Sequence, residues 1–93
     1  MPSDPQRPGE AARIAGRDEG TLVERALTGE RAAFGTLVER YAAQARRVAR
    51  AVLGDPDDAD DAAQDAFLSA LVKLEQCDPR RPFGPWLMRI VAN

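Results

Sequence analysis

The sequence predicts an all-α domain, a small bundle of three to four helices. From residue 18 onward, apolar residues recur at spacings of three and four, which is the period of a helix that buries one face. No segment alternates apolar and polar residues as a half-buried strand does. Glycines and prolines stand between the periodic segments, where helices commonly end and begin.

The first 17 residues are predicted to be a flexible tail, because they carry three prolines and scattered charges without apolar periodicity. The helical domain is expected to span residues 18–93. Its first helix is expected to be short, since Asp18 or Thr21 can cap its start and Gly29 suits its end. The apolar stripe of this helix comprises Leu22, Val23, Ala26 and Leu27.

The second predicted helix, from about residue 30 to residue 53, has the clearest amphipathic pattern in the sequence. Gly54 is expected to end it, and Asp55 and Pro56 form the turn that follows. The apolar side comprises Phe34, Leu37, Val38, Tyr41, Ala45, Val48 and Val52. The opposite side comprises Glu39, Arg46, Arg47 and Arg50. We expect these arginines to be solvated and to complement the C-terminal end of the helix dipole.

A third helix is predicted from about residue 58 to residue 74, and a fourth from Pro85, because proline is favoured at the first helical position. Asp57 or Asp58 can cap the third helix, and the helix dipole stabilises acids in a first turn by roughly 0.3 to 1 kcal/mol each. A calcium-binding loop does not fit these acids, because its sixth position requires glycine and Asp60 stands there. Paired-carboxylate hydrolysis does not fit either, since nothing else in the chain indicates a substrate cleft.

The third predicted helix has two distinct faces. Its core face comprises Ala59, Ala63, Ala66, Phe67, Ala70 and Leu74. On the opposite face lie Asp61, Gln64, Asp65, Leu68 and Val72. An acidic face with leucine and valine at its centre favours a docking surface for a basic, partly apolar protein partner. The alternatives are a solvated face and a second buried contact.

Length, charge and cysteine content restrict the possible functions. A chain of 93 residues is too small to enclose a large active site. Its net charge is only -2, but the charge is unevenly distributed: arginines concentrate at residues 46–50 and 80–89, and acids at residues 55–65. Cys77 is the single cysteine, and the chain has no histidine, no glycine-rich phosphate loop and no metal-ligand spacing. No enzymatic activity and no cofactor are therefore expected. Without a membrane-spanning apolar run or a signal peptide, a cytoplasmic protein with no membrane insertion is expected.

Two motifs follow each other along the chain, first DDADDAAQDAFLSAL and then, after a loop, CDPRRPFGPWLMRIVAN. Together they resemble the core of the bacterial extracytoplasmic-function (ECF) sigma factors. The preceding segment, LVERALTGERAAFGTLVERYAAQARRVARAVLGD, is similar to the first half of the same domain. The resemblance covers about residues 21–93 and implies sigma factor domain 2, although Leu71 stands where the family often has an aromatic residue. Family members continue with a linker and a domain that reads the −35 element, so the chain is expected to be truncated before that domain.

The resemblance implies a transcription initiation factor, a promoter-recognition subunit of bacterial RNA polymerase. In the family, the helix that corresponds to residues 58–74 docks on the clamp helices of the polymerase β′ subunit, which present a basic surface. The matching positions in this chain are Asp61, Gln64, Asp65 and Leu68. The acids would then serve protein binding. An anti-sigma factor is a further expected partner.

The segment after Cys77 combines arginines with aromatic residues, which suits contact with phosphates and the stacking or capture of unpaired bases. In the family, the corresponding loop and helix recognise the −10 promoter element and hold its non-template strand melted. The predicted DNA-binding residues are Arg80, Arg81, Phe83, Trp86, Arg89 and Asn93. Leu87 and Ile90 are expected in the core, and Trp86 suits either role. A helical protein-interaction module without a direct DNA role is the alternative function, against which this segment argues.

Overall fold

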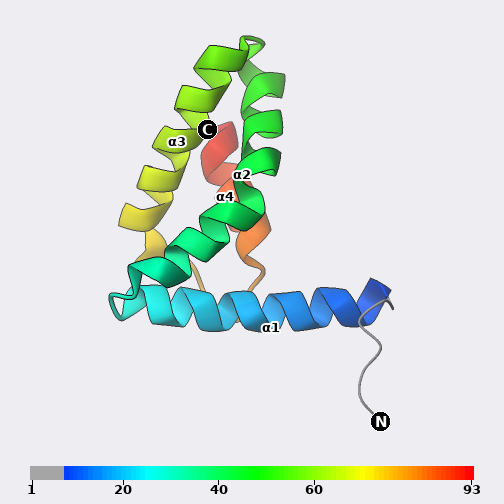
Figure 1. Ribbon diagram of the computed structural model, residues 1–93, viewed down its shortest axis with the longest axis vertical. Coiled ribbons are helices and arrows are strands. Elements are labelled where there is room, and N and C mark those ends of the chain that lie inside the picture. Colours follow the sequence, from blue (N-terminus) through cyan, green and yellow to red (C-terminus); the bar gives the residue numbers. More distant parts are fainter. Residues whose placement is uncertain (1–7) are drawn as a thin grey trace.

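The computed structural model describes the backbone of residues 8–93 and the side chains of residues 18–93. In that part of the chain there are four α-helices, one 3₁₀ turn and no strand, so the predicted all-α fold is confirmed (Figure 1). The elements are α1 (Pro8–Leu27), α2 (Arg31–Leu53), α3 (Pro56–Val72), the 3₁₀ turn η1 (Leu74–Gln76) and α4 (Phe83–Ala92).

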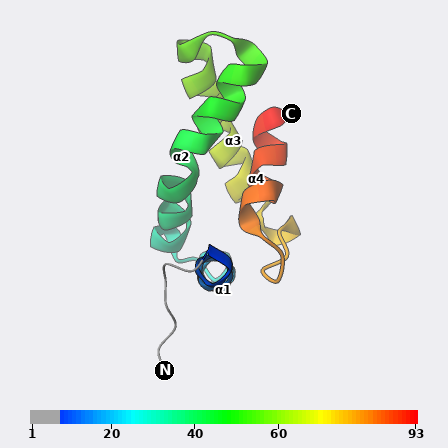
Figure 2. The ribbon, with the colours of Figure 1, turned by 90° about the vertical axis from the view of Figure 1, so that its right-hand side faces the viewer.

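The two long helices α2 and α3 form a hairpin, and α1 crosses its open end (Figure 1). Figure 2 shows α1 end-on beneath the other helices, with α4 beside the hairpin. The most extensive contact joins α2 to α3, and α4 packs against both of them. The short connection between α2 and α3 accounts for this arrangement, because consecutive helices with a tight link usually lie antiparallel and side by side.

The ends of α2 and α3 follow from local chemistry. Gly29 and Gly54 adopt φ values of 101° and 83°, in the left-handed region that favours glycine, so both predicted helix stops are confirmed. The cap of α3 is Asp55, whose carboxylate accepts hydrogen bonds from the backbone N–H of Asp57 at 2.8 Å and of Asp58 at 3.1 Å. The prediction that Asp57 or Asp58 caps this helix is therefore wrong. Proline at the first position allows the helix to begin two residues earlier.

The ends of the later helices also differ from the prediction. The α-helical geometry of α3 ends at Val72, and the chain tightens into the 3₁₀ turn that contains Leu74. The fourth helix begins at Phe83, two residues before the predicted start at Pro85. This position remains compatible with proline, because the first N–H groups of a helix have no partner within the helix.

The first helix is longer than the sequence predicted. It begins at Pro8, so the part of the predicted tail from Pro8 to Arg17 has a helical backbone. Proline suits the first helical position, and the alanine, glutamate and arginine residues that follow favour helix even without an apolar stripe. The remainder of the predicted tail, residues 1–7, lies outside the described residues.

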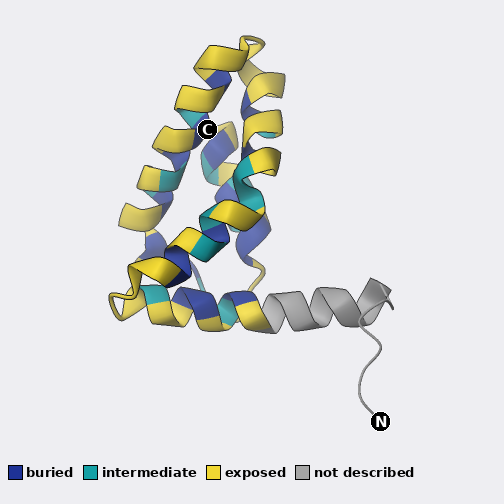
Figure 3. Cartoon of the chain, in the orientation of Figure 1, coloured by how far each residue is buried: buried dark blue, intermediate teal, exposed yellow. Residues whose placement is uncertain are grey.

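The core lies where the inner faces of the four helices meet (Figure 3). Phe83, Leu37, Leu87 and Val23 are its largest fully buried side chains. Alanines make up much of the buried surface of α2 and α3, and such small side chains let neighbouring helices approach closely. The buried alanines of the two helices are Ala33, Ala45, Ala49, Ala59, Ala63, Ala66 and Ala70. The predicted core face of α3 is thereby confirmed, with Phe67 partly buried against it.

One predicted core residue of α2 is exposed. Val52 has 60% of its surface accessible, because it lies in the last turn of α2, at the tip of the hairpin. Leu53 beside it is also 50% exposed. The apolar stripe of the sequence thus continues beyond the part of the helix that the other elements cover.

Candidate protein-binding and nucleic-acid-binding surfaces

The acidic face of α3, formed by Asp61, Gln64, Asp65, Leu68 and Val72, is exposed over its whole length. Leu68 is 64% exposed and Val72 is 83% exposed, and Leu71 beside them is 45% exposed. The possibility of a second buried contact is therefore wrong for the described part of the chain. Exposed apolar side chains among acids remain available to a partner.

The carboxylates of this face, those of Asp61 and Asp65, are not paired with basic side chains of the described residues. Among the described side chains, the only aspartate of α3 in an ion pair is Asp60, whose Oδ1 lies 4.0 Å from Nε of Arg46. Asp61 and Asp65 form no ion pair with any described residue. The face therefore presents free negative charge, which complements a basic surface.

The basic loop, residues 78–82, is shaped by the carboxylate of Asp78. Its Oδ1 accepts hydrogen bonds from the backbone N–H of Arg80 at 2.9 Å and from Nε of Arg80 at 3.1 Å, and its Oδ2 accepts one from Nη2 at 3.2 Å. The Oδ2 atom also lies 4.0 Å from Nε of Arg81. The hydrogen bonds from Arg80 lower the pKa of Asp78, and the same contact raises the pKa of Arg80. Both guanidinium groups still face solvent, with side chains 89% and 84% exposed.

A depression of about 440 Å³, which we call the loop hollow, lies between the basic loop and α4. It is lined by Gln76, Cys77, Asp78, Arg81, Pro82, Pro85, Trp86 and Arg89. Three of the predicted DNA-binding residues, Arg81, Trp86 and Arg89, thus meet around one concave surface. Arginines beside a partly exposed aromatic ring can contact a phosphate and stack on an unpaired base.

The other three predicted DNA-binding residues do not line this hollow. Arg80 is exposed on the basic loop and bonds to Asp78. Phe83 is 1% exposed, with its ring centroid 5.6 Å from that of Tyr41 and 5.7 Å from that of Trp86. The prediction that Phe83 contacts DNA is wrong for this structure, because a fully buried ring in the first turn of α4 cannot reach a ligand. Asn93 is exposed but lines a different depression, between α3 and α4, together with Asp65 and Lys73.

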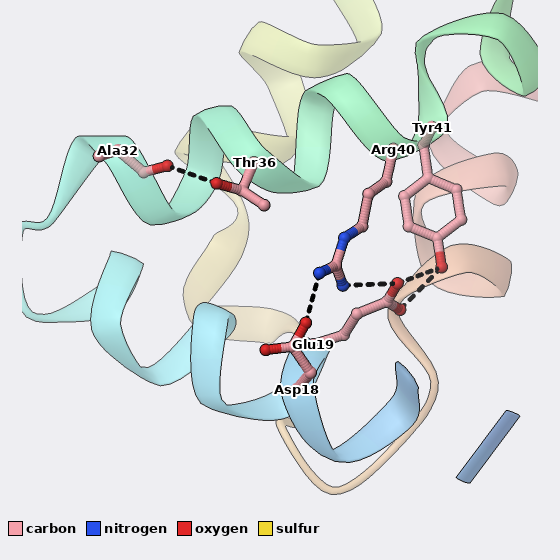
Figure 4. Close-up of polar contacts among 6 residues, drawn as sticks. All are labelled: Asp18, Glu19, Ala32, Thr36, Arg40 and Tyr41. Atoms are coloured by element: carbon pink, nitrogen blue, oxygen red, sulfur yellow. Dashed lines mark hydrogen bonds and ion pairs between the residues drawn. The ribbon is translucent and has the colours of Figure 1, made fainter. Parts of the chain in front are cut away.

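A polar contact between α1 and α2 was not predicted from the sequence (Figure 4). Glu19 is only 8% exposed, and the hydroxyl of Tyr41 donates to its carboxylate, with oxygen distances of 2.7 and 2.9 Å. Nη1 of Arg40 lies 3.6 Å from the same carboxylate, and Nη2 of Arg40 pairs with Asp18. Burial, and then the bond to Glu19, raise the pKa of Tyr41 to about 12. A tyrosine on an apolar stripe was the available signal, because a buried hydroxyl usually has a partner.

Other candidate groups show no sign of chemistry. Cys77 is 3% exposed, and burial followed by the charge of Asp78 raises the pKa of its thiol, so the reactive thiolate is disfavoured. Over the described residues, no group of three or more potential ligands is placed to hold a metal ion. None of the helices searched there is long and apolar enough to cross a membrane. Arg47 and Arg50 are exposed on α2, as predicted.

Comparison with known proteins gives the family. A family model described as Sigma-70 region 2 matches residues 37–93, which is more than half of the chain. The chain belongs to the Sigma-70 region 2 family. This match confirms the resemblance drawn from the two sequence motifs.

Named relatives of this region 2 domain are sigma factors. RNA polymerase sigma factor CnrH of Cupriavidus metallidurans is 42% identical over 73 residues, which cover 77% of this chain and 38% of the relative. The ECF RNA polymerase sigma factor SigW of Bacillus subtilis is 32% identical over 71 residues, covering 76% of this chain and 38% of the relative. The chain thus spans about two fifths of the length of these relatives.

Solved structures agree with the region 2 fold. An engineered region 2 of sigmaE, determined by NMR in complex with GTAAAA, has a TM-score of 0.75 and 35% identity, covering 81% of this chain and 78% of that one. CnrH in complex with the cytosolic domain of CnrY has a TM-score of 0.73 and 38% identity, covering 80% of this chain and 48% of that one.

Proposed function

We propose that this domain acts in transcription initiation, as the part of an ECF sigma factor that recognises and helps to melt the promoter −10 element. The observation that carries this proposal is the loop hollow, which joins Arg81, Trp86 and Arg89 in a domain whose sigmaE relative was solved with GTAAAA. Cationic side chains supply attraction to phosphates, and an aromatic ring supplies a stacking surface for an unpaired base. Such a domain works by binding, without chemistry of its own, in the cytoplasm where the polymerase is found.

The acidic face of α3 is proposed to dock on the β′ clamp helices of RNA polymerase. Asp61, Gln64, Asp65 and Leu68 point away from the core and stand on one regular helix, so the surface is already formed before binding. Unpaired carboxylates steer a basic partner, and the exposed leucine supplies apolar contact at the centre. An anti-sigma factor is a further proposed partner, because a relative, CnrH, was solved with the cytosolic domain of CnrY.

The acidic face also limits what the domain can do alone. Its charge repels the DNA backbone until a protein covers it, and one small module supplies less interface than specific duplex complexes use. We therefore expect the isolated chain to bind the β′ clamp helices but to show no sequence-specific affinity for duplex promoter DNA.

The test is a selection from single-stranded oligonucleotides with a randomised hexamer, carried out with the chain bound to RNA polymerase core and with the chain alone. Enrichment of one hexamer with core present supports the proposal. Binding to core without any enriched hexamer would favour the protein-interaction module. Specific submicromolar binding of the isolated chain to duplex DNA would contradict the division of roles between polymerase and DNA surfaces.

A further inference from the structure

The contact between Glu19 and Tyr41 lies directly behind the loop hollow. The ring of Tyr41 packs against Phe83 at a tilt of 55°, and Phe83 packs against Trp86 at a tilt of 44°. Trp86 in turn lines the hollow. A continuous row of three rings therefore leads from the carboxylate on α1 to the surface proposed to receive DNA.

The basic loop and the first turn of α4 that follows it both rest on this part of the molecule. A Cβ added to Gly20 of α1 would lie 2.6 Å from the backbone oxygen of Pro79, so α1 touches the loop backbone. A Cβ added to Gly84 would lie 2.9 Å from Cε1 of Tyr41, so the tyrosine ring touches the backbone of the first turn of α4. The loop thus has one close backbone contact with α1, and the helix that follows it has another with Tyr41.

The hydrogen bond to Glu19 determines where the Tyr41 ring lies. A carboxylate with so little exposure is costly unless it is paired, and here the hydroxyl of Tyr41 and the guanidinium of Arg40 supply its partners. Without the hydroxyl, the carboxylate keeps only the more distant arginine, and the ring loses its only polar anchor among the described residues. The ring can then shift against Phe83 and Gly84.

We propose that Glu19 and Tyr41 are positioning residues for the loop hollow, setting the location of Trp86 and of the basic loop for capture of the single-stranded −10 element. This inference rests on the proposed function of the hollow. It assigns a role in DNA recognition to two residues that do not themselves line the hollow. It also separates this role from docking on β′, because neither residue belongs to the acidic face of α3.

The test uses Tyr41→Phe, which removes the hydroxyl and keeps the ring. The chain is bound to RNA polymerase core, and the probe is a single-stranded oligonucleotide carrying the hexamer enriched in the selection. We expect the dissociation constant for DNA to rise roughly three- to tenfold, with unchanged affinity for core. Since Trp86 is the only tryptophan, its emission in the free chain reports the hollow directly, and we expect its maximum to shift.

Two substitutions of Glu19 distinguish positioning from general stability. Glu19→Gln keeps an oxygen that accepts the tyrosine hydroxyl, so DNA affinity and Trp86 emission should stay near those of the unchanged chain. Glu19→Ala should reproduce the loss seen for Tyr41→Phe. Glu24→Ala, on an exposed site of α1, is the matched control and should change nothing.

The outcomes separate this inference from the proposed function. If the unchanged chain on core binds the oligonucleotide and Tyr41→Phe binds it equally well with the same emission, the positioning role is wrong and the proposed function stands. If the unchanged chain on core binds no DNA, both are overturned. If Tyr41→Phe weakens binding to core as much as binding to DNA, the contact only stabilises the fold.

Discussion

The acidic face of α3 and the loop hollow are built in different ways. The acidic face needs a single helix, because Asp61, Gln64, Asp65 and Leu68 fall on one side of it through helical spacing alone. The hollow is assembled from η1, the basic loop and α4, and it is supported from behind by α1 and α2. A surface on one helix should tolerate changes elsewhere in the fold, whereas an assembled surface should respond to them.

The largest expected effect is on the acidic face. Leu68→Arg places a positive charge at the centre of the surface proposed to meet a basic partner, and we expect affinity for the β′ clamp helices to fall by at least about tenfold, or about 1.4 kcal/mol. Because Leu68 is 64% exposed, the free energy of unfolding should change by no more than about 0.5 kcal/mol. Titration against a clamp-helix fragment and a thermal melt give the two values.

Val52→Arg is the matched control for that substitution. Val52 is 60% exposed but lies at the tip of the hairpin, on α2. Its change should leave β′ affinity intact. Equal loss in both variants would mean that the added charge acts at a distance, and unchanged affinity in Leu68→Arg would remove the docking proposal.

The difference between a surface on one helix and an assembled surface also explains how much of each the sequence predicts. The faces of α3 could be read from helical spacing, since burial of Ala63 and Ala70 forces Leu68 outward. The buried state of Phe83 could not, because an aromatic ring beside arginines fits a core or a nucleic-acid surface equally well. The bond from Tyr41 to Glu19 joins residues 22 positions apart, which no local pattern reveals. The start of α3 lies two residues before the predicted one, because several neighbouring aspartates could each act as its cap.

The second prediction concerns the positive charge of the basic loop. Replacing both Arg80 and Arg81 with alanine should weaken the salt dependence of binding to single-stranded DNA. The magnitude of the slope of log affinity against log salt should fall by roughly one to one and a half units, since each lost phosphate contact removes about 0.7. Both side chains are exposed and outside the core, so binding to core polymerase should be unchanged. The double substitution of Arg47 and Arg50, exposed on α2, is the control. An equal fall in slope for that control would mean that only the net charge of the domain matters.

The third prediction tests whether the hollow depends on α1. Gly20→Ala brings a Cβ to 2.6 Å from the backbone oxygen of Pro79, so the loop or α1 must move. We expect a loss of about 1 to 3 kcal/mol in stability and weaker DNA binding, with β′ affinity unchanged at a temperature where the domain is folded. Gly35→Ala on α2, where nothing lies within 4 Å, should instead stabilise the helix by about 0.5 to 1 kcal/mol. A folded Gly20→Ala variant with normal DNA affinity would show that the hollow does not need this contact.

The smallest expected effect concerns Asp78, which holds the same arginines that are proposed to meet DNA. Asp78→Asn keeps an oxygen that can accept the backbone N–H of Arg80, now 2.9 Å from Oδ1, but removes the negative charge that competes with a phosphate. Because that charge is partly exposed and salt screens it, we expect affinity for single-stranded DNA to rise only roughly two- to fivefold at low salt, and the gain to vanish at high salt. Acid should also raise the DNA affinity of the unchanged chain, because it neutralises Asp78. Since Arg80 lowers the pKa of Asp78, the charge persists as the pH falls, and this gain should appear only below the ordinary titration range of aspartate. A loss of affinity in Asp78→Asn would mean that the carboxylate orients the arginines for DNA more than it competes for them. The hollow would then depend on a contact within the loop as well as on its support from α1 and α2.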